Sequence, residues 1–98
     1  MIKHVILWKL KEDVTAPQEV KAGIKRELEA LKGVVPGIVE IQVQIEGLAS
    51  SNADVLLDST FVSEEALKAY AVHPAHVRVA QDFVVPFVQT RLCLDFNV

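Results

Sequence analysis

Apolar residues recur along the chain with two different spacings, one typical of strands and one typical of helices. The order of the segments that show each spacing limits the possible folds more than any other feature. In four segments apolar and polar residues alternate, as in strands with one buried face. These segments run from Ile2 to Lys11, from Ile38 to Ile45, from Ala53 to Phe61 and from about Gln89 to Asn97. Two others, one after Pro17 and one after Ser63, repeat their apolar residues at helical spacing. The predicted order is strand, helix, strand, strand, helix, strand.

The helical segments carry recognisable start and stop signals. Thr15 offers a hydroxyl that is predicted to cap the first helix, and Pro17 suits its first turn. Ser63 is predicted to cap the second helix in the same way. The pair His73-Pro74 should break this helix in two, because the residue before a proline is pushed out of the helical region. We therefore expect an α+β, ferredoxin-like β-α-β-β-α-β sandwich with a split second helix.

In such a sandwich one face of the sheet packs on the helices and the other is bare. The most apolar set is predicted to face the helices: Ile6, Trp8, Val39, Ile41, Val43, Val55, Leu57, Phe61, Leu92, Leu94 and Phe96. Opposite it we expect a mixed face with Val5, Leu7, Leu56 and Cys93 among charged residues. A partly apolar face with charges of both signs is costly to leave in water and is complementary to itself. The chain is therefore predicted to form a homodimer through this face.

Composition excludes several classes of protein. The 98 residues are predicted to form a single domain over residues 1–98. The formal net charge is −3 and no basic cluster occurs, so nucleic acid is not an expected partner. There is no apolar run of the ~20 residues that a membrane helix needs, and Met1 leads into a strand rather than a signal peptide; no membrane partner and a cytoplasmic location are expected. Cys93, the only cysteine, has no disulfide partner within the chain.

Three residues able to share or transfer protons are predicted to converge on one apolar space. His4 alternates with Ile2 and Ile6 on the helix-facing side of the first strand. His76 follows the helix break at a position expected to point at the sheet, and Tyr70 points inward from the preceding helix. Histidine titrates near neutrality, and a buried phenol can orient a carbonyl oxygen. Tyr70 and His76 are accordingly the candidate catalytic residues for acid/base chemistry without a cofactor.

Further residues are predicted to line the same space, although each also has a purely structural interpretation. The candidate ligand-binding residues are His4, Ile6, Trp8, His73 and Phe83. Taken alone, His4 is typical of a neutral histidine bonded to backbone, and Trp8 of a core residue. His73 and His76 have a spacing found in metal sites, but His73 is expected to cap a helix and no third ligand is evident, so no metal is predicted.

Three stretches of the chain resemble one known family. They are Ile2-Lys3-His4-Val5, the run from Ala53-Asp54-Val55 through Phe61 into Ser63-Glu64-Glu65-Ala66-Leu67, and Tyr70-Ala71-Val72-His73-Pro74-Ala75-His76-Val77. On these residues, and above all on the last run, the whole chain resembles the stress-responsive dimeric α/β-barrel (Dabb) proteins. The resemblance implies a dimer in which two sheets close around each other, and a stress-response protein. It implies no particular reaction, because most bacterial members have none assigned.

Within that family the chain is similar to a plant polyketide cyclase of the olivetolic acid cyclase type, which works without metal or cofactor. By this resemblance Tyr70 and His76 take the positions of the catalytic pair, and His4 that of a cavity-lining histidine. A second histidine and a tyrosine of the cyclase site are matched by Val55 and Arg26. The same substrate is therefore not expected.

Three functions remain open on the sequence, which leaves undecided whether the protein is an enzyme. The leading hypothesis is a cavity that binds a small, partly apolar carbonyl or phenolic ligand, with His76 as base and Tyr70 orienting the ligand's oxygen. In the second, Tyr70 and His76 are structural and the dimer is a stress-related binding module. The third draws on the resemblance to monooxygenase-like dimeric barrels, in which His76 would contact haem or substrate.

Overall fold

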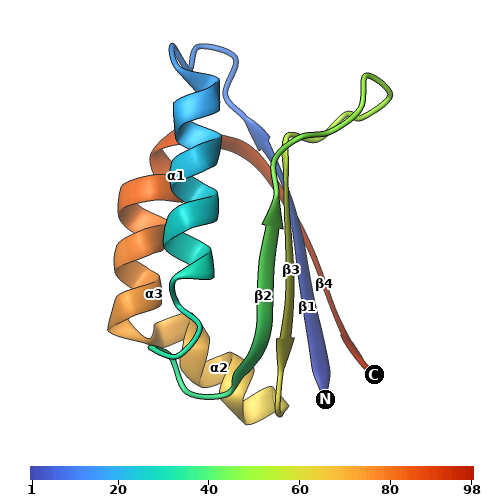
Figure 1. The fold of residues 1–98 in the computed structure, drawn as a ribbon, viewed down its shortest axis with the longest axis vertical. Coiled ribbons are helices and arrows are strands. Elements are labelled where there is room, and N and C mark those ends of the chain that lie inside the picture. Colours follow the sequence, from blue (N-terminus) through green and yellow to red (C-terminus); the bar gives the residue numbers. More distant parts are fainter.

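The computed structural model describes residues 1–98 as a four-stranded antiparallel sheet with helices on one face (Figure 1). The elements are β1 (Ile2–Leu10), α1 (Pro17–Glu29), β2 (Ile38–Gln44), β3 (Val55–Phe61), α2 (Glu64–Val72), α3 (Pro74–Val79) and β4 (Val88–Asn97). Between α3 and β4 the chain forms a π-helical turn, Ala80–Val84, and a 3-10 turn, Val85–Phe87. The strand order is β2-β3-β1-β4. The predicted ferredoxin-like fold with a split second helix is confirmed.

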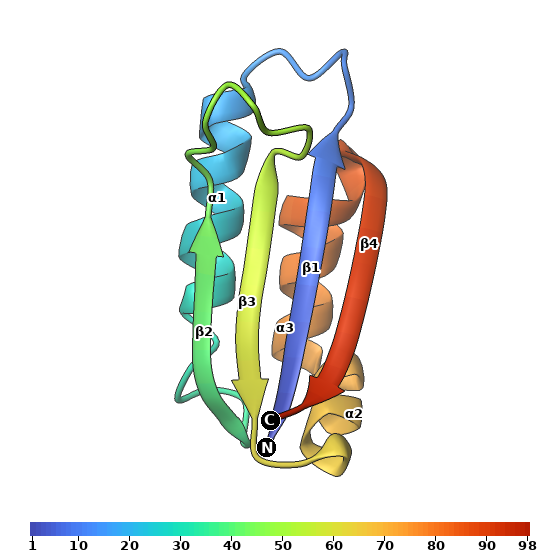
Figure 2. The same ribbon diagram turned by 90° about the vertical axis from the view of Figure 1, so that its right-hand side faces the viewer.

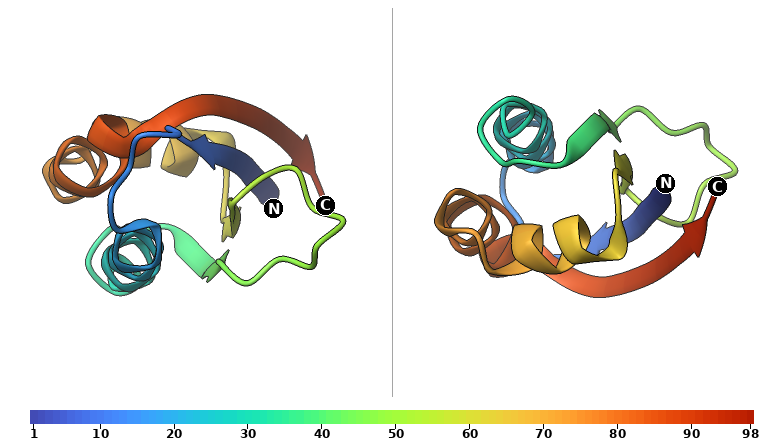
Figure 3. Two further views of the ribbon diagram at one scale, coloured as in Figure 1. Left: turned by 90° about the horizontal axis from the view of Figure 1, so that it is seen from above. Right: turned by 90° about the horizontal axis from the view of Figure 1, so that it is seen from below.

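Helices cover only one face of the sheet. Figure 2 looks onto the uncovered face, with α1 and α3 behind the strands. α1 packs over β2, and α2 contacts β1 and β3 at the end of the sheet where both termini lie. Figure 3 shows that α1 and α3 run side by side and that the sheet curves, with β4 arching at its edge. The half of the sheet formed by β1 and β4 is therefore covered by α2, α3 and the turns that follow.

The local signals predicted two of the three helix starts. The Ser63 hydroxyl accepts a hydrogen bond from the Ala66 N–H at 3.1 Å, which caps α2 as expected. His73 has an extended backbone, and its Nδ1 accepts from the Ala75 N–H at 3.1 Å, so it both ends α2 and caps α3. The prediction that Thr15 caps α1 was wrong. Its N-cap is Ala16, with no side-chain hydrogen bond.

The register of β4 differs from the prediction. Paired residues on neighbouring strands share a face, and Cys93 pairs with the buried Ile6. Cys93 therefore lies on the helix-facing side, while Leu92, Leu94 and Phe96 lie on the bare side. The predicted placement of these four residues was wrong. The prediction assigned the more apolar set of β4 to the core, and an error of one residue in register exchanges the two faces of a strand.

The remaining strands follow the predicted alternation. Seven of the residues expected to face the helices are buried: Ile6, Trp8, Ile41, Val43, Val55, Leu57 and Phe61. Val39 is only partly buried, because the pairing of β2 with β3 shifts by one residue at this point of the strand. The core therefore lies between these strands and the helical layer, to which α1 contributes Ile24 and Leu28, α2 contributes Tyr70 and α3 contributes Val79.

An apolar row crosses the bare face of the sheet. Leu7 on β1 pairs with Leu56 on β3 and with Leu92 on β4. Leu92 and Leu94 keep 64% and 65% of their surface exposed. Beside this row, Lys3 forms an ion pair with Asp58 at 2.8 Å. The bare face thus combines exposed leucines with paired charges. None of the helices has both the length and the apolar character needed to cross a membrane.

Candidate functional site

A cavity of about 860 Å³ lies between the sheet and the part of the helical layer formed by α2 and α3. It is bounded by β1 and β4 on one side and by α2, α3 and the turns after α3 on the other. Five of the predicted site residues line it: His4, Ile6, Trp8, Tyr70 and His76. Most of its lining is hydrophobic. A volume of this order, an apolar lining and a few polar groups are typical of small-molecule sites.

His73 and Phe83 do not line this cavity. The ring of His73 is used in capping α3. Phe83 packs against α1, where the Arg26 guanidinium lies 5.9 Å from the centre of its ring. In a regular α-helix Phe83 would share the face of His76, because the two residues are at i and i+7. The π-helical turn over Ala80–Val84 has more residues per turn than an α-helix, so Phe83 points elsewhere. Neither residue is therefore part of the cavity site.

Tyr70 is the most deeply buried polar side chain of the cavity. Only 2% of its surface is exposed, and its hydroxyl is buried with no hydrogen-bond partner. Its ring lies 4.9 Å from that of Phe61 and 4.1 Å from that of His76, between centroids. Burial raises the pKa of the Tyr70 phenol well above its ordinary value, and the nearby charge of Arg91 opposes this only in part. At neutral pH the phenol is therefore a free O–H donor.

The geometry of His76 leaves one ring nitrogen free to accept a proton. Nδ1 lies 3.3 Å from the backbone oxygen of Ala71. Because a carbonyl only accepts, Nδ1 carries the hydrogen, and in the neutral ring Nε2 then holds a lone pair. Burial lowers the pKa of His76 below the ordinary histidine value; the bond to Ala71 opposes this, and the neighbouring His4, Arg91 and His73 add to it. His76 is therefore neutral at pH 7 and can act as a base.

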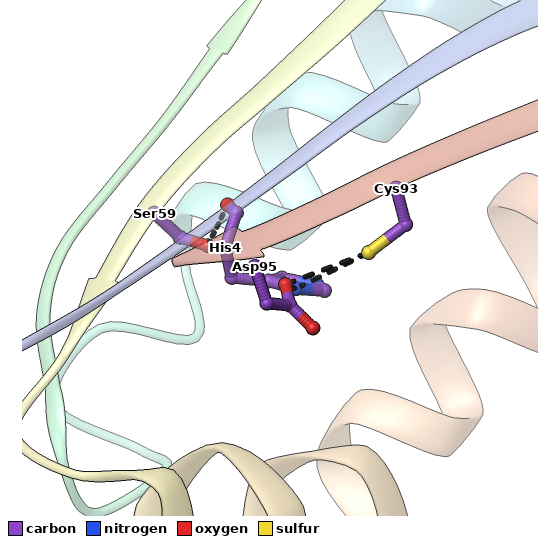
Figure 4. Close-up of polar contacts among 4 residues, drawn as sticks. All are labelled: His4, Ser59, Cys93 and Asp95. Atoms are coloured by element: carbon purple, nitrogen blue, oxygen red, sulfur yellow. Dashed lines mark hydrogen bonds and ion pairs between the residues drawn. The ribbon is translucent and has the colours of Figure 1, made fainter. Parts of the chain in front are cut away.

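His4 is held from both of its neighbouring strands (Figure 4). The Ser59 hydroxyl on β3 donates to the backbone oxygen of His4 at 2.8 Å. On β4, Asp95 accepts from His4 Nδ1 at 2.5 Å. Figure 4 shows the Asp95 and Cys93 side chains projecting from the same side of β4 toward the helices, with the thiol 3.5 Å from the Asp95 carboxylate. His4 is thus bonded to a carboxylate as well as through its backbone.

The same cluster offers a donor set that a transition metal could use. One ligand atom from each of His4, Cys93 and Asp95 lies within 4.8 Å of the other two. Two of these groups hold protons that a metal would have to displace. Nδ1 of His4 donates to Asp95, while burial and the bond to Asp95 raise the pKa of the Cys93 thiol. The arrangement is that of an aspartate orienting a histidine ring.

Sequence reasoning missed the polar residues of β4. Arg91, Cys93 and Asp95 all line the cavity, each two residues from the next. The available signal was that these polar residues occupy every second position of an apolar strand. The prediction assigned them to the bare face, which was wrong. The pairing of His4 with Asp95 across the two strands would have corrected that assignment.

Two comparisons of the sequence with known proteins identify its relatives. The family model described as Stress responsive A/B Barrel Domain (Dabb) matches residues 2–98. The chain is 29% identical over 98 residues to a stress-response A/B barrel domain-containing protein of Arabidopsis thaliana. This match covers 98% of the chain and 36% of that protein, so the chain spans about a third of the length of this curated relative.

Two solved structures illustrate the range of proteins that share this fold. A dimeric protein of unknown function with a ferredoxin-like fold from Bacteroides fragilis is 28% identical, with a TM-score of 0.92, covering 99% of this chain and 95% of that one. A hydroxynitrile lyase from Passiflora edulis is 16% identical, with a TM-score of 0.79, covering 97% of this chain and 90% of that one. At that identity the second likeness shows the fold alone.

The unpartnered hydroxyl of Tyr70 predicts an unusual mutational result. Tyr70→Phe should leave the free energy of unfolding unchanged or raise it by about 1 kcal/mol, because it removes a buried group that has no hydrogen bond. Ser59→Ala is the matched control, since it removes a fully buried hydroxyl that is bonded, and should cost about 1 kcal/mol. Urea unfolding measures both. Equal losses in the two variants would mean that the Tyr70 hydroxyl is not free.

Proposed function

The chain belongs to the stress-responsive A/B barrel (Dabb) family, and on this basis we propose that its cavity binds a small, partly apolar carbonyl or phenolic compound. We further propose that Tyr70 and His76 act on the carbonyl by acid/base chemistry. One observation carries the proposal: a buried phenol O–H without a partner lies beside an imidazole that is neutral at pH 7. An unbonded buried donor costs free energy, and a ligand oxygen would supply its missing acceptor.

The proposed step is proton abstraction next to a carbonyl group. Nε2 of His76 takes the proton from the carbon beside the carbonyl. The electron pair of that C–H bond forms a C=C bond, and the π pair of the C=O bond moves onto the carbonyl oxygen. The Tyr70 hydroxyl donates a hydrogen bond to this oxygen and so stabilises the enolate. Return of the proton from His76 regenerates the ketone. The apolar lining strengthens the hydrogen bond to the developing charge.

His4 supports this site from the sheet. Its ring lies 6.2 Å from that of Tyr70, between centroids, and the two rings meet edge to face. The Asp95 carboxylate and the Ser59 bond fix the position of His4, so the wall opposite His76 is rigid. We assign His4 a lining role and His76 the role of base, since only His76 stacks directly on the phenol.

The chemistry can be tested without knowing the natural ligand, by following hydrogen–deuterium exchange of the methyl protons of 4-hydroxyacetophenone by NMR in D₂O. The protein should accelerate this exchange. His76→Gln should lower the accelerated rate by about a hundredfold or more, the usual contribution of a positioned base. Tyr70→Phe should also lower it, although the fold is retained. Arg78→Gln, which changes a side chain outside the cavity, should not lower it.

The same assay has a predicted pH profile. Because burial lowers the pKa of His76, the base form should accumulate already below the ordinary histidine range. Exchange should rise as pH increases from 5 and level off before pH 7. Loss of exchange in His4→Gln with retention in His76→Gln would contradict the assignment. Saturable binding of the ketone with no exchange would contradict the acid/base step and favour a binding module.

We also propose that the protein is a homodimer through the bare face of the sheet, with Val5, Leu7, Leu56, Leu92 and Leu94 at the contact. The exposed apolar row supports this, as does the dimeric state of the Bacteroides fragilis protein. Cys93, predicted to be part of this contact, is excluded because it lies on the opposite face. Large apolar patches on isolated proteins usually mark contacts of this kind.

If the bare face forms the dimer contact, lysine substitutions on this face should convert the dimer into a monomer. The double variant Leu92→Lys and Leu94→Lys should sediment as a monomer at micromolar concentration, because four desolvated lysines would meet across a two-fold contact. Val72→Lys, at a 75% exposed apolar position on α2 in the helical layer, is the control and should leave the dimer intact. A wild-type protein that sediments as a monomer would refute the contact.

A further inference from the structure

Arg91 is the one arginine of the chain without an ion pair. Of the three arginines, Arg26 pairs with Glu27 at 3.1 Å, and Arg78 reaches Glu27 at 3.2 Å. Both lie on the helical layer, outside the cavity. Arg91 lines the cavity and takes part in none of the ion pairs of the chain. A guanidinium without an acidic partner therefore borders a largely apolar site.

Arg91 is exposed, but it lies on the face of the sheet that lines the cavity. It is the cross-strand partner of Trp8, which is buried and faces the helices, so Arg91 leaves the sheet on the same side. Its positive charge acts on Tyr70 and on His76, lowering the pKa of each. Arg91, Tyr70 and His76 line the same cavity, so one small ligand could touch all three.

The nearest acid on the same strand face does not neutralise Arg91. Asp95 lies four residues farther along β4, roughly 13 Å at the usual rise of a strand, and its carboxylate is bonded to His4. The β4 wall of the cavity thus has a cation at Arg91 and an anion at Asp95, while Lys68 and Glu64 line the cavity from α2 as a pair of opposite charges on one helix. A ligand with one negative group would be oriented by this field, with that group at Arg91 and away from Asp95.

We infer that the ligand of this cavity is an organic acid, a keto or phenolic carboxylate whose carboxylate is bound by Arg91 and whose apolar body lies against Ile6 and Trp8. This inference rests on the proposed function and narrows its class of ligand. Guanidinium groups bind carboxylates through two parallel hydrogen bonds, which gives both affinity and orientation. With the carboxylate fixed at Arg91, a carbonyl farther along the ligand can meet the O–H of Tyr70.

Two probes that differ only in charge test the inference. 4-Acetylbenzoate and 4-acetylbenzamide have the same ring and the same methyl ketone, and only the first carries a carboxylate. Titration followed by NMR should show that the wild-type protein binds the acid about ten- to a hundredfold more tightly than the amide, the range expected for hydrogen bonds to charged groups. This preference should weaken as salt is added.

Substitutions of two arginines, one inside and one outside the cavity, test whether Arg91 is the residue that binds the carboxylate. Arg91→Gln should bring the affinity for the acid down to that for the amide, and Arg91→Lys should restore only part of the difference, because it keeps the charge but loses the paired donors. Arg78→Gln removes an arginine that lies outside the cavity and should leave the preference unchanged. Circular dichroism of each variant checks that the fold is intact.

The possible outcomes separate this inference from the proposed function. Equal affinity of the wild-type protein for acid and amide, or a preference for the acid that survives in Arg91→Gln, would overturn the inference and leave the carbonyl site standing. Binding of neither probe, together with no binding of 4-hydroxyacetophenone, would overturn both. A preference for the acid that is lost in Arg91→Gln and kept in Arg78→Gln would establish the carboxylate site.

Discussion

The pairing of β1 with β4 in one register determines what each face of the sheet can do. With His4 opposite Asp95 and Trp8 opposite Arg91, the polar residues of β4 turn toward the helices. The leucines between them are then exposed on the bare face. A single register thus creates both the polar lining of the cavity and the apolar face proposed for the dimer. A slip of the pairing by one residue would exchange the two faces of β4, and both the polar lining and the apolar face would be lost.

Partial coverage by helices explains why a cavity exists on this side of the sheet. α1 lies over β2, and the core is well packed there. Over β1 and β4 the second helix is broken at His73-Pro74 and continues through a π-helical turn. Side chains of these short pieces surround the space rather than fill it. Burial beside this cavity shifts the pKa values of two neighbouring groups in opposite directions. It raises the pKa of Tyr70, which stays protonated, and lowers that of His76, which stays neutral.

The sequence predicted the fold well because its signals were local. Alternation, the Ser63 cap and the His73-Pro74 break act within a few residues, and the structure has each of them. The convergence of His4, Tyr70 and His76 on one cavity was also predicted, from the inward faces of three elements.

What the sequence did not predict depends on contacts between distant elements. The face of Cys93 is decided by the pairing of β4 with β1, which hydrophobicity alone assigned wrongly. Phe83 was predicted to line the cavity, as it would in a regular α-helix, and the π-helical turn moves it toward α1. The partnership of Asp95 with His4 joins residues 91 positions apart. No local pattern could have indicated it without the register.

The central claim is that a carbonyl ligand lies in this cavity against Tyr70 and His76. Isotope-edited nuclear Overhauser spectra of ¹³C-labelled protein with unlabelled 4-hydroxyacetophenone test it directly. We predict contacts from the methyl group of the ligand to ring protons of Tyr70 and His76, and from its aromatic ring to Trp8. Contacts confined to the leucines of the bare face, such as Leu92 and Leu94, or the absence of any contact under saturating ligand, would contradict the claim.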